Sequence, residues 1–235
     1  MDLPIDIVLF LVVLVGFFAI GLPLITSRVS VPRKVEFEEI PDHALSPAQT
    51  LYFARLDPKL REMGYRPYGN RIPTNMQGRA LVRLYLSDVD PAIVMMNLLT
   101  SDVGGSGDHP MNYLEIMTRY RDGSILSTRN AEISEVLDVL PDHVIQERRG
   151  LRDPASLKRA HDLKAEEFRS REPVFSRADE FEQAFHQYHE RWCEHQVSRG
   201  LLRVVDGDED RLRPTVKAGV RGIGNFLNPF ADNFT

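Results

Sequence analysis

Cysteine is almost absent from this sequence. Cys193 is the single cysteine among 235 residues, so the chain cannot form an internal disulfide. The cysteine spacings that bind haem or iron–sulfur clusters are also missing, which excludes a covalently held redox centre of those kinds. Gly and Pro number only 15 each, which excludes collagen-like and low-complexity proteins. With 43% hydrophobic and 27% charged residues, the composition is that of a globular protein with a core.

The sequence lacks an excess of positive charge, since its net charge is −5. Residues 1–34 sum to +1 and residues 211–235 to +3, which leaves −9 for residues 35–210. Binding to phosphate backbones requires a basic face, so we expect no nucleic-acid partner. An acidic body between two basic ends suits a domain whose ends lie near an anionic membrane surface.

Residues 7–27 contain no charged side chain. A helix of that length spans about 30 Å, the thickness of the hydrocarbon layer of a bilayer. The preceding residues 1–6 contain two Asp and no Lys or Arg, unlike the basic start of a cleaved signal peptide. We therefore expect a transmembrane helix over residues 7–27 that holds the chain in the lipid bilayer, preceded by a short tail of residues 1–6.

The basic residues around this segment predict its orientation. None precedes it, whereas Arg28, Arg33 and Lys34 follow it closely. Positively charged flanks tend to stay in the cytoplasm. The sequence therefore predicts a single-pass protein of the cell (inner) membrane with its N-terminus outside and its C-terminal domain cytoplasmic.

The remaining chain divides into three predicted parts: a juxtamembrane linker over residues 28–45, a soluble domain over 46–210 and a basic segment over 211–235. Within the domain, Ser46-Pro47-Ala48-Gln49 is typical of a helix start with a capping box. Residues 65–77 have no clear period and are predicted to be irregular.

Strand patterns follow this region. Residues 79–86 alternate in polarity, residues 92–99 form an apolar run, and Asp122-Gly123 predicts a hairpin turn between residues 113–120 and 125–128.

The second half of the soluble domain contains mainly helix signals. A short helix is predicted around residues 134–140 and a strand over 143–148. Asp153-Pro154 begins a longer helix, and a capping signal at Ser176 and Asp179 begins another. Together these elements predict an α+β fold, with a mainly antiparallel sheet of about four strands and helices packed on one face.

One helix face combines residues that could bind a metal. His186, His189 and Cys193 are spaced three and four residues apart, and these side chains are ligands for zinc or a related transition metal. The spacing is permissive rather than diagnostic, and a simple polar flank of the helix is the preferred interpretation. We therefore expect no metal, no other cofactor and no catalytic residue.

The C-terminal segment, residues 211–235, is predicted to dock on another surface. Its apolar residues repeat at helical spacing, but three glycines make it a poor helix by itself. The docking surface could be the domain core, the membrane interface or a partner subunit. The residues predicted to dock are Arg211, Arg213, Val216, Lys217, Val220, Arg221, Ile223 and Leu227.

The stretch YLEIMTRYRDGSILSTRN, residues 113–130, resembles a pattern in uncharacterised bacterial single-pass membrane-anchored proteins. The resemblance implies a shared hairpin and no particular activity.

The function expected from the sequence is that of a non-catalytic accessory or scaffold subunit of a larger membrane complex, such as a photosynthetic or respiratory one. Its partners would be other membrane-protein subunits. Two alternatives stay open: a membrane-anchored cytoplasmic ligand-binding or sensory domain, and an enzyme with an unrecognised, metal-dependent site.

Overall fold

A computed structural model describes residues 26, 28–76, 79–100, 111–131, 137–175 and 180–227, without the side chains of residues 79, 100, 111 and 223–227. The described residues divide into two compact units. The sheet unit contains residues 35–131 and 140–187, and the terminal unit contains residues 26–34, 137–139 and 188–227.

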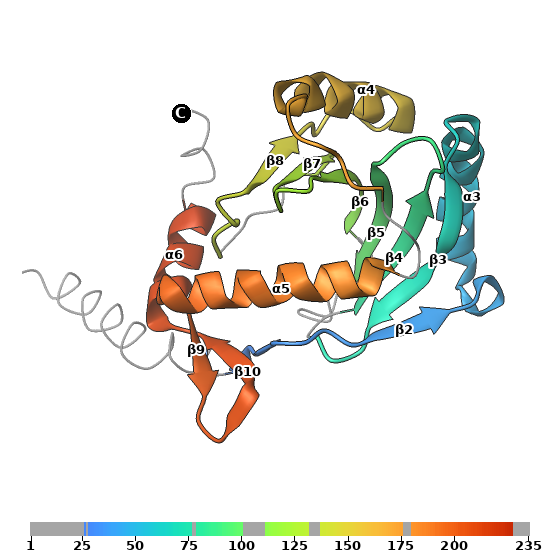
Figure 1. Cartoon of the computed structure of the whole chain (residues 1–235). Helices are drawn as coiled ribbons and strands as arrows, with labels where there is room; N and C mark the ends of the chain where they lie inside the picture. Colours follow the sequence, from blue (N-terminus) through green and yellow to red (C-terminus); the bar gives the residue numbers. More distant parts are fainter. Residues whose placement is uncertain are drawn as a thin grey trace, which may run out of the picture. The chain divides into compact units, whose positions relative to one another are not determined.

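Seven strands form one mixed sheet in the sheet unit and lie in chain order across it (Figure 1). Every neighbouring pair is antiparallel except the last, in which the two strands run parallel. The strands are β2 (Phe37–Ile40), β3 (Arg66–Pro73), β4 (Arg79–Leu86), β5 (Ile93–Thr100), β6 (Met111–Arg119), β7 (Ile125–Arg129) and β8 (His143–Glu147).

Helices cover both faces of this sheet. On one face, α3 (Pro47–Glu62) and α4 (Pro154–Ala165) bury Phe53 and Leu157 against residues that include Leu81 of β4. Side chains alternate between the two faces of a strand, so Leu84 of β4 points to the other face. There it packs against Phe181 at the start of α5 (Phe181–Ser198). The described part of this unit also contains the short 3-10 helices η2 (Asp42–Ala44) and η3 (Glu166–Phe168).

The expected sheet of about four strands with helices on one face is therefore wrong. The structure is an α+β fold with a larger, mixed sheet between helices. The strand missed within residues 65–77 is β3, whose pattern is interrupted by Pro67, Gly69 and Pro73. The sheet accommodates Pro67 because β2 pairs only with residues 70–73 of β3, so no strand on that side needs the missing N–H.

Local signals in the sequence correspond closely to the observed element ends. The Ser46 side chain accepts a hydrogen bond from the Gln49 amide, and the Gln49 side chain accepts one from the Ser46 amide, which confirms the capping box. Asp153 caps α4 by accepting from the Ser156 amide at 3.1 Å. Gly123, with φ of 87°, forms the predicted turn between β6 and β7. Ser176 and Asp179 lie outside the described residues.

The terminal unit contains a second, three-stranded sheet. Strand β10 (Asp208–Pro214) lies between β1 (Val31–Pro32) and β9 (Leu202–Val205). Its core joins Leu202 and Leu212 to Cys193 of α5. Helix α6 (Val216–Leu227) follows β10 and buries Ala218 completely.

The predicted single-pass membrane topology is not upheld. Among the described residues, no helix is both long and apolar enough to cross a membrane. The longest, α5, has 18 residues and carries Glu182, Glu190 and Glu194, whereas a span requires about 20 mostly apolar residues. The proposed span over residues 7–27 lies outside the described part except for Thr26. The location in the membrane, the external N-terminus and the contact with the bilayer were all inferred from that span. These predictions are therefore corrected together with the predicted topology.

The domain boundaries also differ from the predicted ones. Residues 28–45, predicted as a linker, contain β1, β2 and η2, because both sheets recruit strands from this stretch. The predicted boundary between residues 210 and 211 falls inside β10. Of the helix predicted around residues 134–140, the described residues 137–140 are not helical.

Candidate functional site

Strand β8 is the outermost strand on its side of the seven-stranded sheet, within the described part of the chain. The Ile125 amide donates to the Asp142 carbonyl and the Arg148 amide donates to the Arg129 carbonyl, both at 2.8 Å. Backbone groups alternate between the two sides of a strand, so the N–H and C=O of Ile145 and Glu147 point away from β7. No backbone hydrogen bond between described residues uses these outward groups. Among the described residues, the sheet therefore has an open edge at β8.

A groove of about 650 Å³ lies beside this edge. One wall is formed by residues 146–151, which are the end of β8 and the turn after it. The other wall is formed by α4 and η3 through Ala160, Leu163, Lys164 and Glu167. We refer to this feature as the β8 groove. All of its lining residues belong to the sheet unit.

Leu163 gives the β8 groove an exposed apolar residue. Helix α4 packs on the sheet through Leu157 and His161, which are both fully buried. Leu163 lies two residues after His161, about 200° further round the helix, and the residue is 75% exposed. An exposed leucine at the mouth of a groove is a candidate contact for a bound molecule.

Most of the charged residues that line the β8 groove form ion pairs. Glu147 accepts from the Nη2 and Nε atoms of Arg129 at 2.7 and 3.2 Å, and Glu167 accepts from the Lys164 ammonium at 2.7 Å. Both acids are thus matched by a nearby cation. Arg148 and Arg149 are exposed, and the Arg149 guanidinium forms an ion pair with Glu147 at 3.8 Å.

A chain of buried polar groups connects the groove to the sheet. With its amide oriented to satisfy its neighbours, Gln146 donates to the Thr128 hydroxyl and the Ala160 carbonyl, each at 3.2 Å, and accepts from Arg148. The Thr128 hydroxyl lies 3.0 Å from His161 Nδ1, and the other ring nitrogen lies 2.9 Å from the Thr118 hydroxyl. The side chain of Gln146, which lines the groove, is therefore held in place by hydrogen bonds to buried residues.

The histidines near the groove are neutral at physiological pH. Burial, assisted by the Lys158 charge, lowers the pKa of His161 to about 4. Burial and the neighbouring Arg129 guanidinium lower the pKa of His143 to about 4 as well. His143 Nε2 lies 2.8 Å from the Ser127 hydroxyl, but Ser127 is fully buried. A substrate could not reach this pair without a rearrangement of the sheet.

The three candidate metal ligands on α5 have other contacts. His189 Nε2 donates to the Pro32 carbonyl at 2.8 Å and lies 3.6 Å from the Cys193 sulfur. Burial raises the pKa of the Cys193 thiol to about 11, so it does not supply a thiolate at neutral pH. The His186 ring lies near the Phe37 ring, with the two centroids 6.2 Å apart and the rings tilted by 48°. No group of three or more potential ligands that could hold a metal ion occurs within the described ranges.

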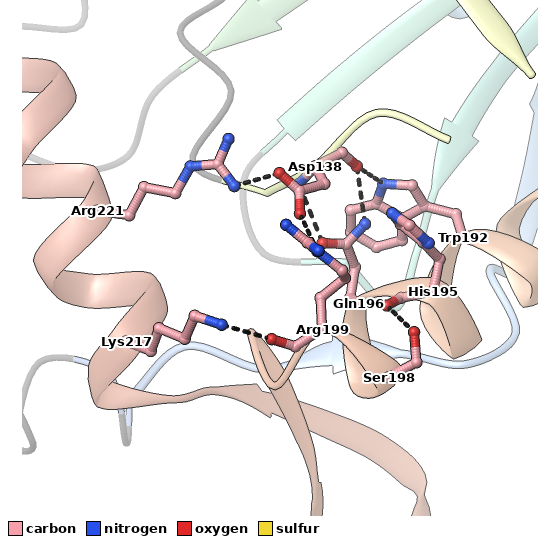
Figure 2. A network of polar contacts seen from close by, with 8 residues as sticks. All are labelled: Asp138, Trp192, His195, Gln196, Ser198, Arg199, Lys217 and Arg221. Atoms are coloured by element: carbon pink, nitrogen blue, oxygen red, sulfur yellow. Dashed lines mark hydrogen bonds and ion pairs between the residues drawn. The ribbon is translucent and has the colours of Figure 1, made fainter. Parts of the chain in front are cut away.

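The predicted docking residues form part of the terminal unit. Figure 2 shows the Asp138 carboxylate facing Arg221 of α6 and Arg199, the residue after α5, with Arg199 Nε at 3.1 Å. The Asp138 carbonyl accepts from Trp192 and Gln196 at 3.1 and 2.7 Å. Although burial alone would raise it, hydrogen bonds from Arg221 and Arg199 lower the pKa of Asp138. This network fixes α6 within its own unit.

Other docking candidates have similar internal roles. Lys217 donates to the Arg199 carbonyl, and Arg211 donates to the Ser30 hydroxyl, each at 2.8 Å. Arg213 lies in β10 opposite Arg203. Val216 and Val220 are 47% and 44% exposed, which leaves a small apolar surface on α6. The side chains of Ile223 and Leu227 lie outside the described part.

Sequence reasoning missed the residues of the β8 groove. The strand over residues 143–148 was expected, but its parallel pairing with β7 and its edge position depend on long-range contacts. One available signal was Leu163, an apolar residue on the polar face of a helix that otherwise buries Leu157 and His161. The adjacent Arg148 and Arg149 were a second signal.

Comparison with known proteins supplies no further assignment, because no family model, no curated protein and no solved structure matches this chain.

Proposed function

We propose that this protein is a non-catalytic accessory protein that binds an extended segment of a partner polypeptide along β8. The observation that carries the proposal is the open edge at Ile145 and Glu147 beside a groove. Addition of a strand to an exposed sheet edge is a common mode of peptide recognition, in which main-chain hydrogen bonds supply affinity.

Helix α4 provides a surface for side-chain contacts beside the edge strand β8. A segment added beside β8 would extend the sheet by one strand, about 4.8 Å further out. Alternate side chains of that segment would then point toward the face covered by α4, where Leu163 is exposed. Covering Leu163 would remove apolar surface from water and stabilise the complex.

The buried polar groups support a binding role rather than a reaction. The hydroxyls of Thr118, Ser127 and Thr128 each contact a histidine ring or the Gln146 amide, and all three residues are buried. These groups shape the strand that forms the groove wall. Binding at β8 would therefore need only main-chain pairing and side-chain packing.

The experiment uses the full chain and three capped hexapeptides in which Val alternates with Glu, Gln or Lys. Binding is measured from the exchange rates of the Ile145 and Glu147 amide protons. We expect at least one peptide to slow both amides, and Leu163→Asp to weaken that peptide by about tenfold or more. The matched control is Leu51→Asp on α3, since Leu51 is 67% exposed and lies outside the groove. If none of the three peptides protects either amide, the proposal is wrong.

A further inference from the structure

Two arginines face each other across the hairpin formed by β9 and β10 (Figure 1). Arg203 and Arg213 are directly opposite in the antiparallel ladder, so their side chains lie on the same face of the three-stranded sheet, with Cβ atoms about 5 Å apart. Leu202 and Leu212, the residues beside them in sequence, belong to the core cluster around Cys193. Because side chains alternate between the faces of a strand, the arginine pair points to the face away from this core.

The charges of this arginine pair are not compensated within the described part of the chain. Neither side chain forms a hydrogen bond or an ion pair there. By contrast, Arg199 and Arg221 of the same unit both contact Asp138. The connection between the two strands and the start of β10 carry four acidic residues that do not contact the pair, Asp206, Asp208, Glu209 and Asp210.

Arg213 also has an unused hydrogen-bond donor. Its Nε atom is buried and lacks a hydrogen-bond partner among the described residues. A buried donor without an acceptor is destabilising, and so are two like charges directly opposite each other in an antiparallel pair. An anion placed between the two guanidinium groups would offset both effects.

The chemistry of the pair favours a phosphate group over a carboxylate. Each guanidinium presents a planar set of N–H donors that matches the oxygens of either group. Two guanidinium groups together carry two positive charges, and a phosphate monoester carries about −1.5 to −2 at pH 7 with three acceptor oxygens. A carboxylate carries a single negative charge on two oxygens. Arg203 is exposed, so a phosphate group can reach the pair from solvent.

We propose that the face of the β9–β10 hairpin that carries Arg203 and Arg213 binds a phosphate group between these two side chains. The exposed Arg203 guanidinium meets the ligand at the surface, and the buried Nε atom of Arg213 donates to one of its oxygens. The site belongs to the terminal unit, whereas β8 belongs to the sheet unit. The proposal is therefore independent of the strand-binding function.

The test titrates inorganic phosphate, capped phosphoserine or acetate into the full chain at constant ionic strength and pH 7. Binding is followed by NMR from the side-chain Nε–H signals of Arg203 and Arg213. Both signals should shift along one saturable curve with a phosphate ligand, and acetate should bind at least about tenfold more weakly. The tighter of the two phosphate ligands identifies whether the phosphate is free or esterified. Arg203→Gln and Arg213→Gln should each weaken binding by about tenfold.

The matched control is Arg55→Gln, Arg61→Gln on α3, which removes two exposed arginines from the sheet unit and should bind phosphate as the parent does. A second measurement is thermal unfolding, in which phosphate should raise the midpoint of the parent and of this control but not that of Arg203→Gln. Shifts that do not saturate, acetate binding as tight as phosphate binding, or equal binding by the parent and both single variants would overturn the proposal.

Discussion

The Glu147 carboxylate on β8 is held by the Arg129 guanidinium on β7, whose Nη2 and Nε atoms lie 2.7 and 3.2 Å from the same oxygen. The two residues are directly opposite in the parallel ladder. This pair therefore helps to fix the outermost strand of the sheet and, with it, the wall of the β8 groove.

Removing the Glu147 charge should destabilise the sheet unit. Arg129 is nearly buried, so Glu147→Gln leaves a guanidinium with a weaker partner inside the fold. We expect the free energy of unfolding to fall by about 1–3 kcal/mol, measured by urea denaturation. The control is Glu172→Gln, whose ion pair with Arg121 is well exposed and should contribute less than about 1 kcal/mol. Equal small effects of both variants would contradict a structural role for the Arg129–Glu147 pair.

Stability should decrease as the pH falls from about 6.5 toward 4. His143 and His161 have folded-state pKa values of about 4, whereas an unfolded histidine has a pKa of about 6.5. In this window the unfolded chain binds protons that the folded chain does not, so stability rises with pH by up to about 1.4 kcal/mol per pH unit for each histidine. His161→Gln should flatten the dependence measured by urea denaturation at several pH values. A parent protein equally stable at both ends of this window would exclude buried neutral histidines.

The Asp138 network should control the stability of α6. Asp138→Asn weakens its contacts with Arg199 and Arg221 while keeping the carbonyl that accepts from Trp192. Hydrogen exchange in the first turns of α6 should accelerate by about tenfold, as expected for a loss of about 1.4 kcal/mol. Amides of β4 and β5 should be unaffected, because they belong to the sheet unit. Unchanged exchange in α6 would mean that other contacts, such as buried Ala218, are sufficient to hold the helix.

Cys193 should be unreactive in the folded protein. The thiol is buried and its pKa is raised to about 11, so thiolate is scarce at pH 8. A thiol reagent such as dithionitrobenzoate should modify it only in denaturant. Rapid modification of the native chain would show that the core around Leu202 and Leu212 opens readily.

Local chemistry accounts for the parts of this fold that the sequence predicted well. The caps at Ser46 and Asp153, the alternation of β4 and the turn at Gly123 depend on residues close together in the chain. Strand β3 was missed because Pro67 and Pro73 interrupt the residue pattern expected of a strand. The strand is stabilised by tertiary pairing, which the local sequence does not reveal.

The candidate site was harder to predict than the fold. The groove depends on β8 pairing with β7 across residues 130–142 and on α4 packing over the sheet, and neither contact leaves a local pattern. The residues singled out from helical spacing instead serve the interior of the terminal unit, as Lys217, Arg221 and His189 show.

The most direct test of the central claim is amide hydrogen exchange along β8 in the full chain. In the free protein, Val144 and Gln146, whose N–H groups face β7, should exchange more slowly than Ile145 and Glu147, whose N–H groups face outward. Saturation with the hexapeptide that binds most tightly of the three should slow the exchange of Ile145 and Glu147 by about tenfold or more and remove this alternation. Ile145 and Glu147 amides that are already protected in the free protein, or that still exchange rapidly with bound peptide, would contradict an open edge that receives a partner strand.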